Sequence, residues 1–216
     1  DILIDGPMTE DSLLQAYKES MQMIDNDLVE LVYPLSPLNP NNVKRVESII
    51  SLEDWDYLFP IRNQAYTYTN FLKAVAKFKS FCKNHEDGVN SDYLCRKHLS
   101  VIFAHLVQET GGHSDLLTEE HWRQGLIYLR EIGWDESSRN GYNNECGPTY
   151  WQSQVWPCGQ FENSEFKSYF GRGAKQLSYN YNYGQFSKFM FGNVSVLLNS
   201  PELVADTWLN LSSALF

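Results

Sequence analysis

The stretch that most constrains the fold runs from Leu94 to Gly112, LCRKHLSVIFAHLVQETGG. Apolar residues recur three, four and seven positions after Leu99, which is the spacing of one face of an α-helix. Further apolar residues occupy much of the other face, and only two polar residues stand between Leu99 and Val107. A helix that is apolar nearly all round is usually buried in a protein core. The sequence therefore predicts a buried helix that ends at the glycine pair 111–112.

The last turn of this predicted helix carries Glu109, a carboxyl group in an unfavourable place. The negative end of the helix dipole and nearby burial both disfavour its ionised form. A carboxyl group that stays protonated near neutral pH is what a general acid requires. The alternative is that Glu109 lies in solvent where the helix frays beside the glycines. From this stretch alone, the solvent-exposed interpretation is the simpler one.

Helical spacing recurs on both sides of this stretch. Ser51 and Asp54 have the spacing of a capping box, and Thr9 and Asp11 are candidate caps for the first segment. The segment 119–130 fits either a helix or an extended chain. We expect the other helices within residues 9–31, 43–50, 55–59, 66–82, 183–190 and 204–215.

Two stretches break the helical pattern. Residues 34–42, PLSPLNPNN, contain three prolines and predict a linker. This divides the chain into residues 1–42, an N-terminal helical extension with its Pro-rich linker, and residues 43–216, the main domain. Residues 133–165 are polar and rich in Gly, Asn and Ser. A structureless stretch of this length inside a compact domain is usually functional.

The net charge of −10 argues against nucleic acids and anionic membranes as partners, because both are bound through basic patches. Aromatic residues make up 14% of the chain, and their faces suit the stacking of sugars, so a neutral substrate fits better. No run of apolar residues approaches the length of a membrane-spanning helix. The chain begins at Asp1 without a visible signal peptide, so it reads as processed or trimmed.

The cysteines indicate an oxidising compartment. None of them forms a CxxC pair, which argues against a zinc site or a redox motif. Their even number suggests disulfides and therefore a secreted protein. Of the three possible pairings, sequence neighbourhood favours Cys82 with Cys95 and Cys146 with Cys158.

Polar and aromatic side chains are concentrated in residues 170–186, FGRGAKQLSYNYNYGQF. The amide and hydroxyl groups of Gln176, Ser178 and Asn182 could face a polar ligand, with tyrosines as apolar platforms. The alternative is a tyrosine-rich turn packed on the core. Taken by itself, the segment favours this second interpretation.

The segment GRGAKQLSYNYNYG resembles the signature of the family 19 glycoside hydrolases, the plant-type chitinases. AHLVQETGG, which begins at Ala104, resembles the segment that carries the general acid of that family. The residues WPC at 156–158 and the C-terminal NSPELVADTWLNLSSALF also match. The resemblance extends from about Trp55 to Phe216, and residues 1–42 have no counterpart in it.

This resemblance implies a mainly α-helical, bilobal, lysozyme-like fold with a substrate cleft and a small β-hairpin near residues 125–135 or 168–178. It implies hydrolysis within chains of β-1,4-linked N-acetylglucosamine, as in chitin or its oligosaccharides, with inversion at the anomeric carbon. An inverting pair of carboxyl groups stands about 6.5–9.5 Å apart, which leaves room for the attacking water. The resemblance implies neither a cofactor nor a metal.

Carried over residue by residue, the resemblance makes Glu109 the general acid. The general base is expected a short loop downstream, where Glu131 ends the segment YLRE, and Glu136 and Glu145 are the alternatives. Ser178 matches the serine that holds the nucleophilic water. The substrate-binding positions implied by the resemblance are Trp156, Gln176, Tyr181 and Asn182.

The chain also departs from the family pattern. Gln108 stands where the family usually has His, and Gly111 replaces a small hydroxyl residue. The family continues beyond the position of Phe216 and carries an Arg behind the acid, so a missing C-terminal part of the same domain is an expected partner.

The alternatives to a chitinase are a peptidoglycan hydrolase and an inactive chitin-binding protein. Asn193 and Asn210 begin glycosylation sequons, which matter in a secreted eukaryotic protein.

Overall fold

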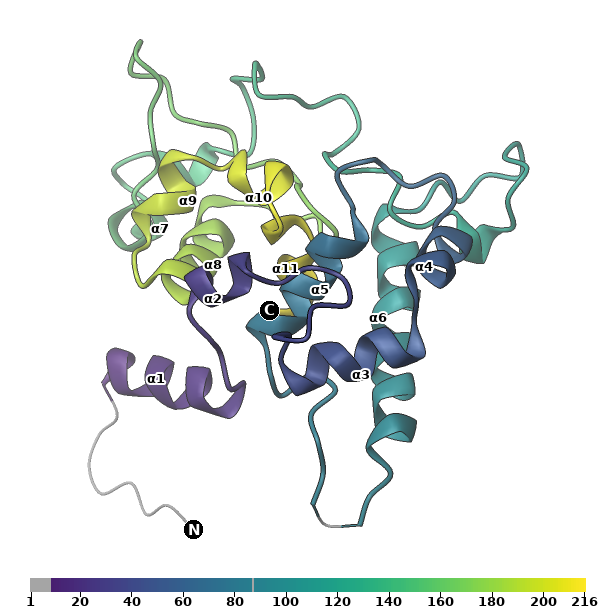
Figure 1. Cartoon of the computed structure of the whole chain (residues 1–216). Coiled ribbons are helices and arrows are strands. Elements are labelled where there is room, and N and C mark those ends of the chain that lie inside the picture. Colours follow the sequence, from purple (N-terminus) through teal and green to yellow (C-terminus); the bar gives the residue numbers. More distant parts are fainter. Residues whose placement is uncertain (1–8, 87) are drawn as a thin grey trace.

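The computed structural model describes residues 9–86 and 88–216, and helices dominate this part of the chain (Figure 1). The helices are α1 Glu10–Ser20, α2 Asn26–Glu30, α3 Asn41–Ile49, α4 Leu52–Leu58, α5 Tyr68–Lys77, α6 Ser91–Thr110, α7 Trp151–Val155, α8 Asn180–Phe191, α9 Ser195–Asn199, α10 Leu203–Asp206 and α11 Leu209–Leu215. Two short 3₁₀ helices, η1 His121–Arg123 and η2 Asn144–Cys146, lie in the long connections. No helix among the described residues has the length and apolar character needed to cross a membrane.

The described residues form two hydrophobic cores, which mark a first and a second lobe. The first lies among α3, α4, α5 and α6 and contains Trp55, Phe71 and Leu106. The second lies among α8, α9 and α10 and contains Tyr183 and Leu197. Helix α11 packs against α5 and contributes to both cores. In Figure 1, α3, α4 and α6 lie on one side of α5 and α11, and α8 and α9 lie on the other.

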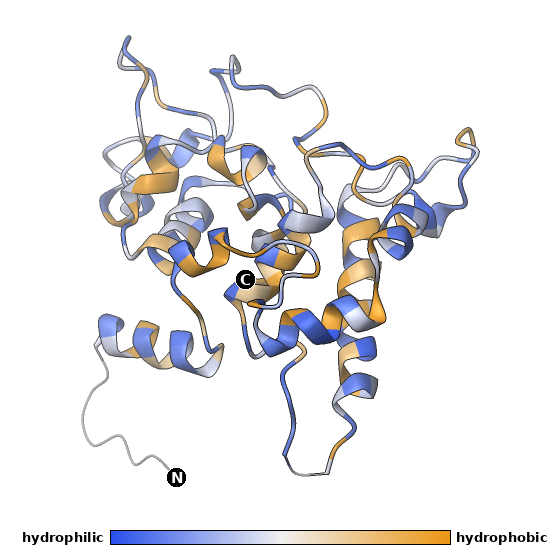
Figure 2. Cartoon of the chain, in the orientation of Figure 1, coloured by the Kyte–Doolittle hydropathy of each residue, from blue (hydrophilic) through white to orange (hydrophobic). Residues whose placement is uncertain are grey.

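Helix α6 packs on one side only, which differs from the expected burial all round. Leu99, Ile102 and Leu106 lie in the first core, whereas the Val101 side chain on the opposite face is 71% exposed. α3, α11 and η1 contact α6, and Trp55 of α4 and Phe71 of α5 pack against Phe103 of α6. These elements leave the side of α6 that carries Val101 exposed, and Figure 2 shows hydrophobic and hydrophilic residues alternating along this helix.

The expected β-hairpin is reduced to single bridges. Arg172 forms antiparallel bridges with Arg130 and with Leu177, within the two regions where a hairpin was expected. No longer strand forms in the described part of the chain. These bridges nevertheless align residues 129–131 with residues 171–173, next to the end of α6.

The N-terminal segment is folded onto the main domain. The expected helix over 9–31 divides into α1 and α2, because Met23 bridges to Phe78 and the Ile24 N–H donates to Lys77 O. The Pro-rich stretch packs against α3, because the Asn39 amide donates to Glu47 Oε2 at 3.1 Å. The Pro-rich stretch is therefore held against the main domain, and its role as a linker stays a prediction. The domain boundary at residue 42 stays a prediction.

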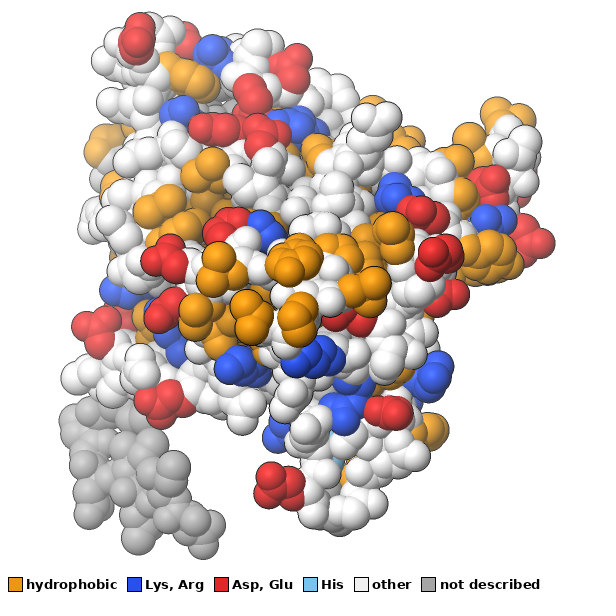
Figure 3. Space-filling model, in the orientation of Figure 1, with side chains coloured by type: hydrophobic (Ala, Val, Ile, Leu, Met, Phe, Trp, Pro, Cys, Tyr) orange, Lys and Arg blue, Asp and Glu red, His pale blue; other side chains and the backbone are white. Residues whose placement is uncertain are grey.

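Exposed apolar side chains gather on the segment that follows α2. Leu31, Leu35 and Leu38 are 69%, 84% and 88% exposed. The segment that follows α2 crosses the middle of the view in Figure 1, and several groups of hydrophobic atoms lie close together at that place in Figure 3.

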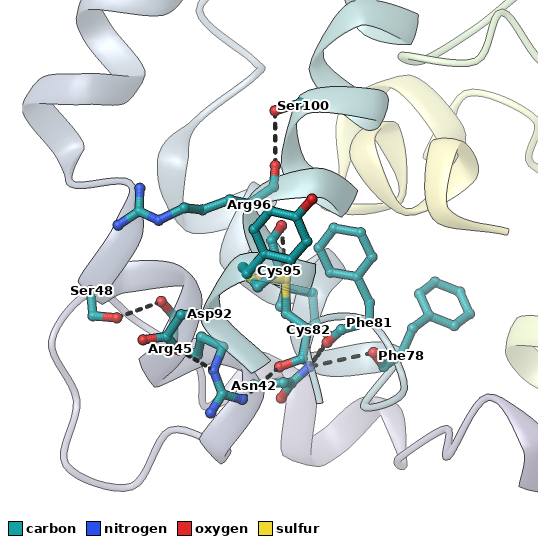
Figure 4. The surroundings of a disulfide bond; sticks show 12 residues. Asn42, Arg45, Ser48, Phe78, Phe81, Cys82, Asp92, Cys95, Arg96 and Ser100 are labelled. Carbon is teal, nitrogen blue, oxygen red and sulfur yellow. Dashed lines mark hydrogen bonds and ion pairs between the residues drawn. A yellow bond between two sulfur atoms is a disulfide. The ribbon is translucent and has the colours of Figure 1, made fainter. Parts of the chain in front are cut away.

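Both expected disulfides are confirmed. Cys82–Cys95 joins the chain after α5 to the first turns of α6, and Cys146–Cys158 closes the loop that contains α7. Figure 4 shows how Asn42 and Arg45 of α3 surround the first bridge. The Asn42 amide donates to the carbonyls of Val75, Phe78 and Phe81. The Arg45 guanidinium donates to Cys82 O and Asp92.

Candidate active site

The end of α6 is fixed by the chain that follows it. The carbonyl of Thr110 accepts hydrogen bonds from the N–H groups of Ile127 and Tyr128, at 3.0 and 3.1 Å. The Thr110 hydroxyl accepts from Leu126 N–H and donates to Leu106 O. Residues 126–128 therefore lie directly beside the last turn of α6, which carries Glu109.

Gly111 makes this close approach possible. A Cβ atom at this position would lie 2.3 Å from the carbonyl oxygen of Val107 and 3.2 Å from that of Gln124. The backbone leaves the helix there and accepts no side chain larger than hydrogen. The replacement of a small hydroxyl residue by Gly111 therefore has a local steric reason.

Glu109 lies on the partly exposed side of α6. Its side chain is 35% exposed, and His105 Nε2, one turn earlier, is 3.6 Å from its Oε1. Lys175 Nζ is 2.6 Å from the same His105 nitrogen. The neighbours of Glu109 are thus a histidine from its own helix and, behind it, a lysine from the GRGAKQLS segment.

Glu131 is held on both carboxylate oxygens. Its N–H donates to Gly171 O at 2.9 Å, and the Gly171 N–H donates to Glu131 Oε2 at 3.1 Å. The Tyr142 hydroxyl donates to Glu131 Oε1 at 2.6 Å. The side chain therefore has a fixed orientation beside the start of the GRGAKQLS segment.

The segment 171–178 contacts the neighbourhoods of both glutamates. Gly171 bonds to Glu131, and Lys175 reaches His105 beside Glu109. The structure thus places Glu131 against Gly171 and, through His105, Glu109 near Lys175 of the same short segment. The Gly173 N–H donates to Leu129 O at 2.8 Å, which anchors the middle of that segment.

Backbone strain accompanies this arrangement. Gln176 and Tyr179 have φ values of 50° and 70°, in the left-handed region that non-glycine residues rarely adopt. Such conformations persist when the surroundings determine them, and they are common at functional sites. The Gln176 amide donates to Gly173 O, and the Ser178 hydroxyl donates to Gln176 O, both at 3.0 Å.

The remaining predicted binding residues lie in the second lobe. Tyr181 stacks on Tyr179 with a centroid distance of 5.6 Å, and the Asn182 amide donates to Ser178 O at 2.9 Å. Trp156 is only 9% exposed and packs against Gly184, where a Cβ atom would lie 2.5 Å from its ring. Little of the indole surface is therefore open to a sugar, and the contact expected for Trp156 stays a prediction.

Of the two alternatives to Glu131, Glu136 is occupied in ion pairs. Its Oε2 is 2.7 Å from the buried Arg172 and its Oε1 is 2.8 Å from Arg130. Burial by itself would raise the pKa of Glu136, but the hydrogen bonds and charges of these two arginines outweigh it and lower the pKa. Glu145 belongs to η2, and its Oε2 is buried without a hydrogen-bond partner.

Four neighbours of the site were not predicted from the sequence: Tyr142, His105, Lys175 and Arg172. Tyr142 comes from a polar loop with no periodicity, and His105 interrupts an apolar helix. Lys175 and Arg172 stood inside the GRGAKQLS motif without an assigned role. Among the described residues, no three His, Cys, Asp or Glu side chains are grouped to hold a metal ion.

The sequence of the chain matches one known protein family over most of its length. The family model described as chitinase class I, glycoside hydrolase family 19, matches residues 53–216. The chain belongs to this family. Endochitinase 3 of Nicotiana tabacum is 33% identical over 169 residues, which are 74% of this chain and 43% of that protein. An endochitinase of Carica papaya is 32% identical over 179 residues, which are 79% of this chain and 64% of that protein.

Solved family 19 structures share the fold. The crystal structure of chitinase C from Streptomyces griseus HUT6037 matches with a TM-score of 0.52 and 27% identity, over 77% of this chain and 64% of that chain. The resemblance to family 19 and the mainly helical, lysozyme-like fold are thereby confirmed. The chain spans less than two thirds of the length of these relatives.

Proposed function

We propose that this protein hydrolyses β-1,4 linkages between N-acetylglucosamine units within chitin, with Glu109 as general acid and Glu131 as general base. The observation that carries the proposal is the segment 171–178, which contacts the neighbourhoods of both glutamates. Family membership supports the substrate class, since relatives of this chain are named endochitinases.

In this mechanism Glu109 donates its proton to the oxygen of the departing sugar. Glu131, ionised, removes a proton from a water on the opposite face of the ring, and the water attacks the anomeric carbon with inversion. Each carboxylate oxygen of Glu131 has a second lone pair, so the bonds from Tyr142 and Gly171 still leave acceptor sites for that water. Ser178 is the residue whose hydroxyl we assign to hold this water.

Substrate binding is assigned to the second lobe and to the GRGAKQLS segment. The Gln176 amide donates to Gly173 O at 3.0 Å and to Tyr128 O at 3.4 Å, whereas the Asn182 amide, which also has two hydrogens, donates to Ser178 O alone among the described residues. The second hydrogen of the Asn182 amide is therefore free to meet a sugar hydroxyl or acetamide oxygen, and Gln176 offers its amide oxygen as an acceptor. Tyr181 presents its ring beside Tyr179, and Trp156 offers the edge of its indole.

The two glutamine variants test this assignment. In Glu109→Gln and Glu131→Gln, the rate on an N-acetylglucosamine hexamer should fall by about 10²–10⁴-fold, because one proton-transfer group is lost in each. Binding of the hexamer, measured by calorimetry, should persist. Glu162→Gln, an exposed carboxylate outside the site, is the matched control and should keep the parent rate. The variants are measured in this chain and in any longer form of the protein that contains it.

The products distinguish the finer claims. Proton NMR during early turnover should show the α-anomer at the new reducing end, as inversion of a β linkage requires. Cleavage of bacterial wall with an untouched hexamer would assign the site to peptidoglycan instead. Hexamer binding without any turnover would indicate an inactive chitin-binding protein. A normal rate in Glu131→Gln with a collapsed rate in Glu145→Gln would transfer the base to Glu145.

We also propose that the protein acts outside the cell. Two disulfides with no free cysteine among the described residues suit an oxidising compartment. A chitin polymer is a bulky substrate that an extracellular enzyme meets directly. Detection of the protein in culture medium or cell-wall extracts, with a cytosolic marker absent, is the measurement that checks this location.

A further inference from the structure

Tyr142 lies in the long polar loop before η2, yet its side chain reaches Glu131. Its hydroxyl donates to Glu131 Oε1 at 2.6 Å, while the Gly171 N–H donates to Glu131 Oε2 at 3.1 Å. One bond comes from a loop side chain and the other from the GRGAKQLS backbone. Because the two donors engage different oxygens, together they fix the plane of the carboxylate.

The ring of Tyr142 packs against two other aromatic rings. Trp134 packs edge-on against it with a centroid distance of 5.0 Å, and Tyr179 packs from another side at 5.3 Å. Gly141, at φ 132°, lets Trp134 approach, since a Cβ atom would lie 2.3 Å from that indole. The Ser168 hydroxyl donates to Gly141 O at 2.8 Å, which holds the backbone just before Tyr142.

Backbone strain falls on the same residues. Tyr142 has φ 54° and Tyr179 has φ 70°, although neither is a glycine. Two strained tyrosines in mutual contact need surroundings that determine their conformation, and strain of this kind collects at functional sites. The loop is therefore shaped to bring this hydroxyl to this carboxylate.

We propose that Tyr142 is a positioning residue that orients the Glu131 carboxylate for proton abstraction from the attacking water. The proposal rests on the assignment of Glu131 as the base. A carboxylate that turns freely about its terminal bond spends much of its time with its oxygens away from the water. A donor on Oε1 removes that freedom without occupying the lone pair that accepts the proton.

The hydroxyl of Tyr142 keeps its proton over the working range. Its hydrogen bond to Glu131, followed by burial and the negative charge of Glu131, raises the pKa of Tyr142 to about 12. Tyr142 therefore stays a donor at any pH at which the enzyme would act, and it does not compete as a base.

Tyr142→Phe tests the hydroxyl apart from the ring, because it retains the contacts with Trp134 and Tyr179. We expect kcat on the N-acetylglucosamine hexamer to fall by about 10–100-fold with KM nearly unchanged. Tyr150→Phe is the matched control: this tyrosine lies in the same loop region, is 48% exposed, and its hydroxyl makes no hydrogen bond among the described residues. It should keep the parent kcat.

A double-mutant cycle separates positioning from a general structural role. If Tyr142 acts through Glu131, Glu131→Gln/Tyr142→Phe should be no slower than Glu131→Gln alone. All variants are compared at a temperature at which their far-UV circular dichroism spectra superimpose. Should Tyr142→Phe fail to fold, incorporation of 3-fluorotyrosine at 142, which retains a hydroxyl and weakens its basicity, supplies the comparison.

The outcomes distinguish this inference from the proposed function. A parent-like kcat in Tyr142→Phe, or additive losses in the double variant, would overturn the positioning role while leaving Glu131 as the base. A parent-like rate in Glu131→Gln would overturn the proposed function itself. A loss in Tyr142→Phe that disappears in the Glu131→Gln background supports both.

Discussion

Arg172 shows how a single side chain can hold the site together. It is 1% exposed, and its guanidinium donates to both oxygens of Glu136, at 3.2 and 2.7 Å. It also donates to Ser168 O and to the Tyr183 hydroxyl. Arginine suits this place because its rigid donors match several acceptors at once. Its backbone continues directly from Gly171, which bonds to Glu131.

Replacing Arg172 should therefore destabilise the fold strongly. Arg172→Met leaves the Ser168 carbonyl and Glu136 without this donor, and the free energy of unfolding should fall by on the order of 3 kcal/mol. Urea unfolding at neutral pH measures the change. Arg139→Met is the control, because Arg139 is partly exposed and 3.8 Å from Glu165, and its loss should be about 1 kcal/mol or less. Equal losses in the two variants would contradict a special role for Arg172.

The helices were largely predictable because their signals are local. Apolar spacing placed the helix over 66–82, where the structure has Tyr68–Lys77, and Thr9 and Ser51 cap α1 and α4 as expected. Local spacing gave no warning of the break between α1 and α2. That break follows from a contact with Phe78, far along the chain.

The candidate site was likewise predictable only where its residues lie in contiguous sequence motifs. Glu109, Glu131 and the GRGAKQLS segment were found by resemblance, because their motifs are contiguous in sequence. The role of Tyr142 depends on residues 131, 134 and 179 meeting in space, and no periodic pattern records such a meeting. The open face of α6 depends on what packs against it, which an apolar helix alone does not specify.

The two disulfides close loops of similar length in different places, with sequence separations of 13 and 12. Because each disulfide lowers the conformational entropy of the unfolded chain, each should raise the free energy of unfolding by about 3 kcal/mol. Only Cys146–Cys158 anchors the chain just after Tyr142. Replacing that pair with serine should therefore lower kcat as well as the unfolding temperature.

The Cys82/Cys95 double serine variant is the matched control for this element. It should lower the unfolding temperature by a comparable amount and retain kcat at a temperature where both variants are folded. Differential scanning calorimetry and hexamer hydrolysis supply the two readings. Equal kcat in both variants would show that the Cys146–Cys158 bridge does not support the loop that carries Tyr142.

At the scale of the whole molecule, buried tyrosines tie stability to pH. Tyr183 is completely enclosed in the second core, and burial raises its pKa to about 12. Burial likewise raises the pKa of Tyr169 in the second core and of Tyr66 in the first core. The unfolded chain exposes these phenols, which then ionise near a pKa of about 10. Both lobes therefore contain groups that resist ionisation while folded.

The sign of the effect follows from linkage. A folded-state pKa above the unfolded value gives stability that is complete below about pH 10 and is lost as pH rises from there toward the folded value. For Tyr183 that window runs up to about 12. The free energy of unfolding, measured by urea titration, should accordingly fall by up to about 1.4 kcal/mol per pH unit for each such tyrosine above pH 10.

Tyr183→Phe separates this contribution from the general repulsion of a chain with net charge −10. The variant should be less stable than the parent at pH 8, because Arg172 loses an acceptor and Phe170 O loses a donor. It should also lose stability less steeply between pH 10 and 12, because one phenol is gone from the unfolded state. Parallel curves for parent and variant over that range would show that Tyr183 does not contribute, and would assign the alkaline loss to charge repulsion or to the other buried tyrosines.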